Sequence, residues 1–289
     1  MPDPAVETTE ETILLEVLAS LHPTAKRNSL RRMVDHGRVR VDGDKATRAN
    51  MKVLKGSLVE VLSKADGDKP LTQPKETIPE PEVLYYDAEI ILANKPAGLL
   101  SVATDRGELD TMFDRVAKWA WENGETRTHL VHRLDRETSG IMIFALSKQN
   151  KEYLQEQFAE RSIYRTYFAL VEGKLPRKHG TEIEWLLEDK NLRVKKVKPN
   201  TKSSKEAITH WEVVKENQST SLVRIAIDTG RRHQIRMAMK SLGSPVVGDD
   251  LHGAKTDPMG RVCLHASSLE FLHPQTDEPV RFETRVPFN

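Results

Sequence analysis

The chain has 289 residues, of which 38% are hydrophobic, and its formal net charge is +1. This length allows two domains and a substantial core, whereas no apolar run approaches the roughly 18 residues that a membrane helix needs. Residues 1–7 are acidic and polar, unlike a secretory signal, and the single Cys263 can form no internal disulfide. We therefore expect a cytoplasmic protein that has no membrane partner and works as a monomer.

Residues 10–64 have the pattern of a small domain. Apolar spacing predicts two helices, and alternation predicts two later strands, over residues 12–21, 29–36, 38–41 and 56–62. Gly37 follows the second helix and is typical of a helix C-terminus. The Asp-Gly pair at 42–43 predicts a tight turn after the first strand.

The second predicted helix is strongly basic. Between residues 24 and 40, six basic residues oppose the single acid Asp35, which gives a local net charge of +5. Clustered cations of this kind bind phosphates, although a solvated surface has the same pattern. The candidate phosphate contacts are Lys26, Arg27, Arg31, Arg32 and Arg38.

Two helices, a strand that ends in Asp-Gly-Asp and a closing strand after Lys-Gly-Ser resemble the small RNA-binding module of the fourth protein of the small ribosomal subunit. The resemblance implies that the basic helix face lies along an RNA backbone. A generic α+β appendage is the alternative, because short helices followed by a hairpin are common. Residues 65–82 hold four prolines among charged residues and predict a semi-rigid linker.

Residues 83–289 alternate strands with a few helices. The clearest expected strands cover 83–86, 90–94, 141–146, 207–213, 222–228 and 280–284, and the expected helices cover 113–121 and 148–160, with Ser147 as the cap of the latter. This pattern predicts an α+β domain with a mixed, largely antiparallel sheet. Residues 190–205 hold seven basic residues and no acid, so this segment is either a disordered loop or one that orders on RNA.

Residues 132–140 read His-Arg-Leu-Asp-Arg-Glu-Thr-Ser-Gly and lead into an apolar strand. That strand fixes the preceding turn, so Asp135 is held rigidly toward a ligand with Arg133 beside it. An Asp in such a turn also commonly caps backbone amides. His129 and His132 have a zinc-like spacing, but no Cys pair or acidic set completes a site, and we expect no metal.

The nonapeptide resembles the signature His-Arg-Leu-Asp-x-x-Thr-Ser-Gly of the RluA-type pseudouridine synthases. Further blocks in the family's order extend the resemblance over about residues 83–289; they lie at 94–100 (Asn-Lys-Pro-Ala-Gly-Leu-Leu), 164–173 (a Tyr-containing strand), 229–236 (Thr-Gly-Arg-Arg-His-Gln-Ile-Arg) and 243–249 (Gly-Ser-Pro-Val-Val-Gly-Asp). The resemblance implies the pseudouridine synthase fold and the isomerisation of uridine in RNA. Because nothing is gained or lost in that reaction, no cofactor is expected.

The resemblance also implies a role for each of four side chains. Asp135 is the catalytic carboxylate, which attacks the sugar or stabilises positive charge on it, and must be ionised for either. Arg236 pairs with Asp135 and lowers its pKa. Arg133 enters the stack that a flipped nucleotide leaves, and Tyr167 lies against the uracil. The residues alone allow plainer alternatives, an exposed helix position for Arg236 and a core position for Tyr167.

His233 and Gln234 are expected to shape the loop of the third block. Ala238 stands where the family commonly has His, a departure that bears on substrate fit. Family analogy favours ribosomal RNA over transfer RNA as the partner. Two other functions stay open: a non-catalytic RNA-binding or ribosome-assembly factor, and a glycosidase-like hydrolase, for which Glu137 is the nearest second carboxylate.

Overall fold

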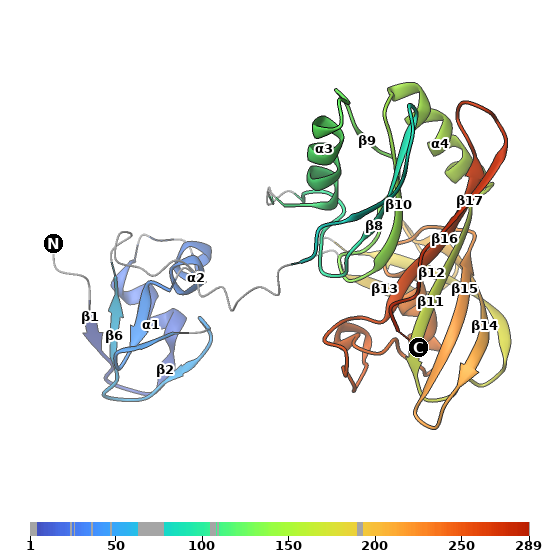
Figure 1. Cartoon of the computed structure of the whole chain (residues 1–289). Coiled ribbons are helices and arrows are strands. Elements are labelled where there is room, and N and C mark those ends of the chain that lie inside the picture. The colour runs from blue at the N-terminus through green and yellow to red at the C-terminus, as the bar shows by residue number, and fades with distance from the viewer. Residues whose placement is uncertain are drawn as a thin grey trace. The chain divides into compact units, whose positions relative to one another are not determined.

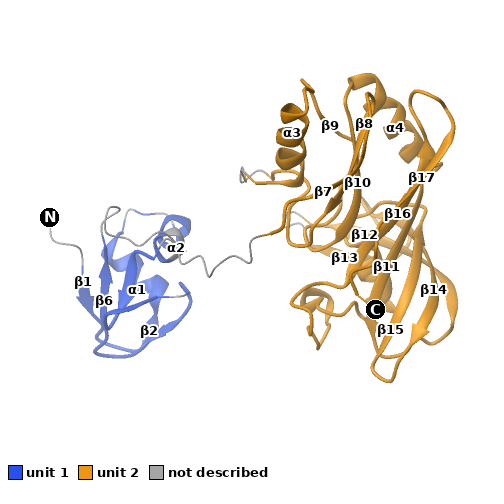
Figure 2. Ribbon diagram, in the orientation of Figure 1, with its two compact units in different colours: residues 1–77 blue, residues 78–289 orange. Residues whose placement is uncertain are grey.

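The computed structural model describes residues 5–62 except 24, 26, 36 and 47, and residues 78–288 except 105–107, 109 and 190–192. The chain forms two compact units, which divide between Thr77 and Ile78 (Figure 2). Lys26 and most of the expected linker over 65–82 lie outside the described residues. None of the helices in the described ranges is both long and apolar enough to cross a membrane.

The smaller unit packs two helices against short strands. Its antiparallel sheet has the order β1 (Ala5–Glu7), β6 (Leu58–Val61), β3 (Val39–Val41) and β4 (Asp44–Lys45), and β2 (Thr12–Ile13) pairs with β5 (Lys52–Val53). Helices α1 (Leu14–Leu21) and α2 (Arg27–Asp35) occupy the predicted places, shifted by one or two residues at their ends. Leu14, Leu18 and Leu30 from these helices are fully buried with Val39 and Val59.

Asp42 and Gly43 form the turn between β3 and β4, as the Asp-Gly pair predicts. Their φ angles are +54° and +85°, and two consecutive positive values are what a two-residue hairpin turn that follows the strand twist requires. The Asp42 carboxylate accepts a hydrogen bond of 2.8 Å from the backbone N–H of Leu58. The turn is therefore tied to the central strand of its sheet.

The larger unit is built on one 11-stranded sheet (Figure 1). Its main path is β13-β12-β14-β15-β11-β16-β10-β8-β7, with β17 paired to β16 and β9 to β10. The strands are β7 (Glu82–Tyr86), β8 (Ile90–Lys95), β9 (His129–Leu130), β10 (Ser139–Ala145), β11 (Tyr164–Glu172), β12 (His179–Glu188), β13 (Val194–Val197), β14 (Lys205–Glu216), β15 (Thr220–Ile227), β16 (Leu264–Leu272) and β17 (Pro279–Glu283). Among the described strands only β10 and β16 pair in parallel, so the predicted mixed, largely antiparallel sheet is confirmed.

Helices cover both faces of the β8–β10 part of the sheet. Successive strand residues point to opposite faces, so Ile91 packs in the same core as α3 (Met112–Glu122) and Ile90 in the core that includes α4 (Lys148–Glu160). The α4 cap is the predicted one, because the Ser147 hydroxyl accepts from the backbone N–H of Asn150. A third helix, α5 (Gln234–Ser241), packs against β12 and β14 and is buried over most of its length.

The sheet has one narrow junction. β10 and β16 pair over only two residue pairs, Ser139 with His265 and Gly140 with Ala266. Gly140 has a φ of +120°, and a Cβ at this position would lie 2.2 Å from the carbonyl oxygen of Ala266. Only glycine therefore permits this approach, which joins the β7–β10 half of the sheet to the rest.

We expect Gly140→Ala to destabilise the larger unit by roughly 3 kcal/mol or more, because the added methyl group must push β10 and β16 apart. The measurement is urea unfolding followed by tryptophan fluorescence, since all four tryptophans (Trp119, Trp121, Trp185 and Trp211) lie in this unit. Gly173→Ala is the control: Gly173 also has a positive φ, but nothing lies within 4 Å of its Cβ position, and we expect a loss of about 1–2 kcal/mol. Equal losses in the two variants would contradict the close approach at Gly140.

Candidate active site

Four side chains singled out by the sequence line a single cleft of about 930 Å³. Arg133 and Asp135 come from the loop before β10, Tyr167 comes from β11, and Arg236 comes from α5. The cleft therefore takes residues from both sides of the β10–β16 junction. Asp135 is half-buried in it, whereas Arg133 is exposed.

A buried lysine holds the chain on one side of Asp135. Lys95 is fully buried, and its Nζ donates to the carbonyl oxygens of Pro96, Leu99 and Arg136 at 3.0, 2.7 and 3.1 Å. The Arg136 carbonyl also accepts the backbone N–H of Gly98 at 2.8 Å. The Lys-Pro block therefore fixes the residue that follows Asp135.

A serine holds the other side. The Ser101 hydroxyl donates to the carbonyl oxygen of Leu134 at 2.6 Å and accepts its backbone N–H at 3.0 Å. Both groups are buried, where hydrogen bonds of this kind are costly to lose. With Arg136 held by Lys95 and Leu134 held by Ser101, the backbone of Asp135 has little freedom to move.

Burial lowers the pKa of Lys95 to about 7, and the nearby charges of Glu137 and Asp135 offset this effect only in part. In the unfolded chain the same group titrates near its ordinary pKa of 10.5. Between these values the unfolded chain binds more protons than the folded one. The contribution of Lys95 to the free energy of unfolding therefore rises with pH in this range.

We expect the free energy of unfolding of the wild type, measured relative to Lys95→Met, to rise from pH 7 to pH 9.5 by up to about 1.4 kcal/mol per pH unit. Urea titrations at several pH values provide the measurement. Lys148→Met is the control, because its ammonium is exposed on α4, where it pairs with Glu152. Parallel pH profiles of the wild type and Lys95→Met would show that Lys95 keeps an ordinary pKa.

Two opposing effects act on the Asp135 carboxylate. Burial is the larger and raises its pKa, while the charges of Arg236, Arg232 and Arg133 and the backbone N–H of His233 lower it. The net shift is upward. Asp135 therefore keeps a proton at higher pH than an exposed aspartate, and the surrounding arginines limit this effect without removing it.

The sequence prediction for Arg236 needs a correction. Arg236 is only 2% exposed, and it forms a two-bond ion pair with Asp249, with both N–O distances 2.6 Å. Its remaining ion pair is with Glu137 at 3.4 Å. Arg236 therefore does not pair directly with Asp135, and it is no exposed helix residue. The charge of Arg236 does lower the pKa of Asp135, but burial outweighs this effect and the net shift is upward.

The turn that carries Asp249 also contacts His233, a residue that lines the cleft. Its 3-10 helix η1 (Asp250–His252) places His252 Nε2 3.0 Å from His233 Nδ1, and both rings are buried. His233 precedes α5 with a φ of +54°, which is uncommon outside glycine. Its backbone N–H hydrogen bonds to Asp135. Motif reasoning assigned no role to Asp249 or His252, although Asp249 ends the last quoted block.

Gln234 holds the loop before α5, as expected. Its side-chain oxygen accepts from the Thr229 hydroxyl and the Arg231 backbone N–H, at 2.8 and 3.0 Å. Its amide nitrogen donates to the Ile208 carbonyl and the Thr209 hydroxyl. All four bonds are internal, so Gln234 supports the loop and not a ligand.

Tyr167 is 7% exposed, packs in the main hydrophobic core and still borders the cleft. Tyr167 is therefore both a core residue and a residue of the cleft, which are the two positions that the sequence allowed. Burial is the main cause of the upward shift in its pKa, so its phenol stays neutral. Tyr164, the competing tyrosine of this strand, is 69% exposed.

The His132 ring is held in place by packing and a backbone hydrogen bond. Its Nε2 accepts the backbone N–H of Ile143 at 3.1 Å, and its ring lies 4.9 Å from that of Phe158. Burial and the charge of Arg165 lower the pKa of His132 to about 3. Across the described ranges, His, Cys, Asp and Glu side chains do not gather in a group of three that could hold a metal ion.

Two family models match this chain. The one described as RNA pseudouridylate synthase matches residues 89–241, which is more than half of the chain. The one described as S4 domain matches residues 14–59. The chain belongs to the RNA pseudouridylate synthase family.

Proteins of similar sequence are named as pseudouridine synthases. The Uncharacterized RNA pseudouridine synthase YhcT of Bacillus subtilis is 33% identical, over 88% of this chain and 83% of its own length. The Ribosomal large subunit pseudouridine synthase D of Neisseria meningitidis serogroup A is 31% identical, over 94% of this chain and 75% of its own. The solved structure of Human RNA Pseudouridylate Synthase Domain Containing 1 has a TM-score of 0.60 at 23% identity and covers 74% of this chain and 86% of that one, which shows a shared fold. This chain is therefore an RNA pseudouridine synthase.

In the S4 domain of the synthase, the predicted basic residues differ in their surroundings. Arg27 is exposed and pairs with Glu16 at 2.8 Å. Arg31 is exposed and contacts Asn28 on its own helix. Arg38 is half-buried, and its Nε donates to the Leu62 carbonyl. The side chains of Lys26 and Arg32 lie outside the described residues.

The basic segment over 190–205 contains a strand. Residues 194–197 form β13, the edge strand that pairs with β12, and Lys196 makes an ion pair of 2.8 Å with the buried Glu184. Lys195 and Lys198 have no such partner among the described residues. Residues 190–192 are not described, and contact of this segment with RNA stays a prediction.

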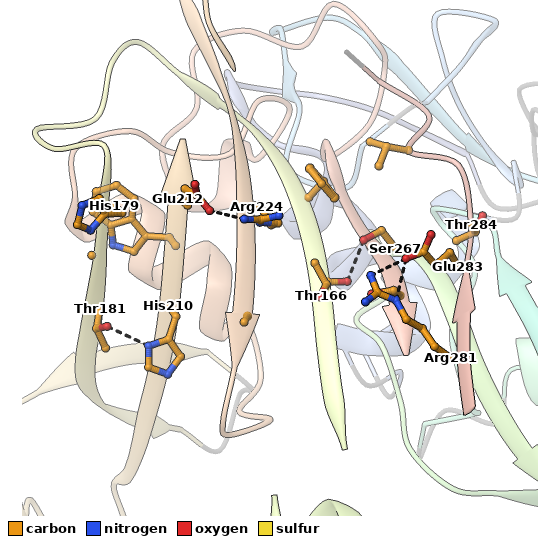
Figure 3. Close-up of a pocket in the computed structure, with 16 residues that line it drawn as sticks. Thr166, His179, Thr181, His210, Glu212, Arg224, Ser267, Arg281, Glu283 and Thr284 are labelled. Atoms are coloured by element: carbon orange, nitrogen blue, oxygen red, sulfur yellow. Dashed lines mark hydrogen bonds and ion pairs between the residues drawn. The ribbon is translucent and has the colours of Figure 1, made fainter. Parts of the chain in front are cut away.

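A second cavity, of about 790 Å³, lies on the opposite face of the synthase sheet. Thr166 and Phe168 line it, whereas Tyr167 between them borders the cleft. Figure 3 shows that its charged side chains are turned toward one another, in the pairs Glu212–Arg224 and Arg281–Glu283. Because these charges are already paired, the cleft around Asp135 is the better candidate for the active site.

Proposed function

We propose that this synthase isomerises uridines of ribosomal RNA and that Asp135 is its catalytic carboxylate. The observation that carries the proposal is the position of Asp135: it is fixed on both sides, faces a cleft lined by arginines and forms no ion pair within the described part of the chain. An unpaired carboxylate keeps its charge available for a reacting group.

The reaction breaks the bond between ribose carbon one and ring nitrogen one and forms a bond from the same carbon to ring carbon five. A proton leaves carbon five and nitrogen one gains a proton, so the product is an isomer. Positive charge develops on the sugar as the first bond breaks. Asp135 either attacks that carbon or stabilises its charge, and both roles need the ionised form.

The other cleft residues support this step. Arg133 is exposed beside Asp135, where its planar guanidinium is free to fill the gap that a flipped nucleotide leaves in a base stack. Tyr167 offers a flat apolar surface on which uracil is able to turn while it stays bound. Arg236 supplies positive charge, while Asp249 holds its guanidinium in place.

Asp135→Asn should abolish tritium release from RNA labelled at uridine ring carbon five, while RNA binding changes little, because the amide keeps the shape of the side chain and loses its charge. In the wild type the rate should fall as pH falls through a pKa that lies above the ordinary 3.8, since burial raises this pKa. The readout is the pH profile of single-turnover release. Release by Asp135→Asn at the wild-type rate would remove Asp135 from the reaction.

Glu137→Gln tests the two-carboxylate alternative. In the structure Glu137 contacts Arg236, so we assign it no chemical step and expect tritium release to persist. A glycosidase-like hydrolase would need a second carboxylate and would liberate free uracil, which chromatography detects. A non-catalytic RNA-binding factor would give neither product.

The choice of ribosomal RNA rests on the relative from Neisseria meningitidis that is named for the large ribosomal subunit. The match to it covers 94% of this chain, so it extends over the S4 region as well as the synthase region. The Dual-specificity RNA pseudouridine synthase RluA of Vibrio cholerae matches over only 68% of this chain. Mapping of pseudouridines in both RNA classes from cells with and without this protein is the direct test. A site lost from transfer RNA alone would overturn the assignment.

We also propose that the exposed arginines of α2 contact RNA phosphates. Arg31→Gln should weaken RNA binding and reduce the slope of log Kd against log salt by about 0.7–0.9. Fluorescence anisotropy at several salt concentrations provides the measurement. Lys52→Gln is the control, because Lys52 lies on β5 and is paired with Glu11; a slope lowered equally in both variants would contradict a specific role for α2.

A further inference from the structure

The arginines that line the cleft carry more positive charge than the Asp135 carboxylate neutralises. Six arginines line it: Arg133, Arg161, Arg165, Arg231, Arg232 and Arg236. Arg236 is paired with Asp249 and Glu137, and Arg232 with Glu188 at 3.6 Å. The other four form no ion pair with any carboxylate in the described ranges. This surplus indicates a site for an anion.

Arg165 is the most firmly held of these four. Its Nη2 donates to the Ile227 carbonyl at 3.2 Å, and its guanidinium carbon lies 5.4 Å from the centre of the Phe158 ring. A Cβ on Gly230 would lie 3.1 Å from its Nη1, so the glycine leaves room for the group. The Arg165 guanidinium is therefore positioned before any ligand binds.

Arg165 also keeps a hydrogen-bond donor unused. Its Nε is buried and has no partner among the described residues. A buried donor without a partner is unfavourable, so binding gains free energy if a ligand oxygen reaches this edge of the guanidinium. An arginine with a free Nε presents the planar donor pattern that recognises phosphate oxygens.

We infer that Arg165 binds the phosphodiester next to the nucleotide that enters the cleft. Arg165 and Tyr167 lie two residues apart on one face of β11, a separation of about 7 Å along the strand. One nucleotide therefore reaches both side chains when its base lies on Tyr167 and its phosphate on Arg165. The inference rests on the proposed function in one respect, that RNA enters this cleft.

Binding of a fluorescein-labelled single-stranded RNA of ten uridines to the full chain tests the inference. We expect Arg165→Gln to weaken binding on the order of tenfold at low salt, the effect of losing one charged hydrogen bond, and to reduce the salt slope by about 0.7. Arg224→Gln is the matched control, because Arg224 lies on the opposite face and is paired with Glu212 (Figure 3). The S4 domain is the same in all variants, so its contribution does not affect the comparison.

Arg165→Lys is the second variant and decides the question if Arg165→Gln does not fold. Lysine keeps the charge and lacks the Nε donor, so the salt slope should stay and the affinity should fall several-fold. A slope for Arg165→Gln equal to that of the control, or an affinity for Arg165→Lys equal to that of the wild type, would overturn the inference. Tritium release by the wild type is measured separately, so a failure of the proposed function is distinguished from a failure of this site.

Discussion

The pairing of β10 with β16 is the constraint on which the synthase unit depends. These strands meet over two residue pairs, and only the lack of a side chain at Gly140 lets their backbones approach. Asp135 lies on one side of this junction, whereas Tyr167 and Arg236 lie on the other. The cleft therefore exists only while the two parts of the sheet stay joined, and a single glycine determines whether its residues meet.

Opposite charges near the cleft are arranged so that Asp135 stays unpaired. Arg236 is a strong cation close to it, yet the Nε and Nη2 of Arg236 both donate to Asp249, at 2.6 Å each. The buried pair satisfies a charge that would otherwise be costly in this interior. Asp135 receives the field of Arg236 without being bound by it, and its carboxylate stays available to a ligand.

Local patterns predicted much of the fold. The cap at Ser147, the turn at Asp42 and the alternation of the long strands depend on neighbouring residues, which the sequence displays directly. The placement of Asp135, Tyr167 and Arg236 in one cleft depends on contacts between segments that are distant in the sequence. It was predicted only because the motifs resemble a known family, and no periodicity contains that information.

The features that the sequence did not predict are buried charged and polar side chains and the partners that they contact. Lys95 and Arg236 are charged residues in polar motifs, and nothing local indicates that both are almost fully buried. The same holds for Asp249, whose partner lies 13 residues earlier in the chain, and for His252, which meets His233 through a turn. The upward shift in the pKa of Asp135 comes from the burial of its own carboxyl group, so it was also outside the reach of pattern analysis.

The two faces of the central strands differ in electrical character although they share a backbone. Inside the cleft several guanidinium groups lack a counter-charge, while on the outer face acids and bases neutralise one another. With a formal net charge of only +1 for the whole chain, the synthase unit acts on a distant polyanion mainly through this asymmetry. An approaching nucleic acid thus exerts a torque that turns the open side toward it, so orientation begins before contact.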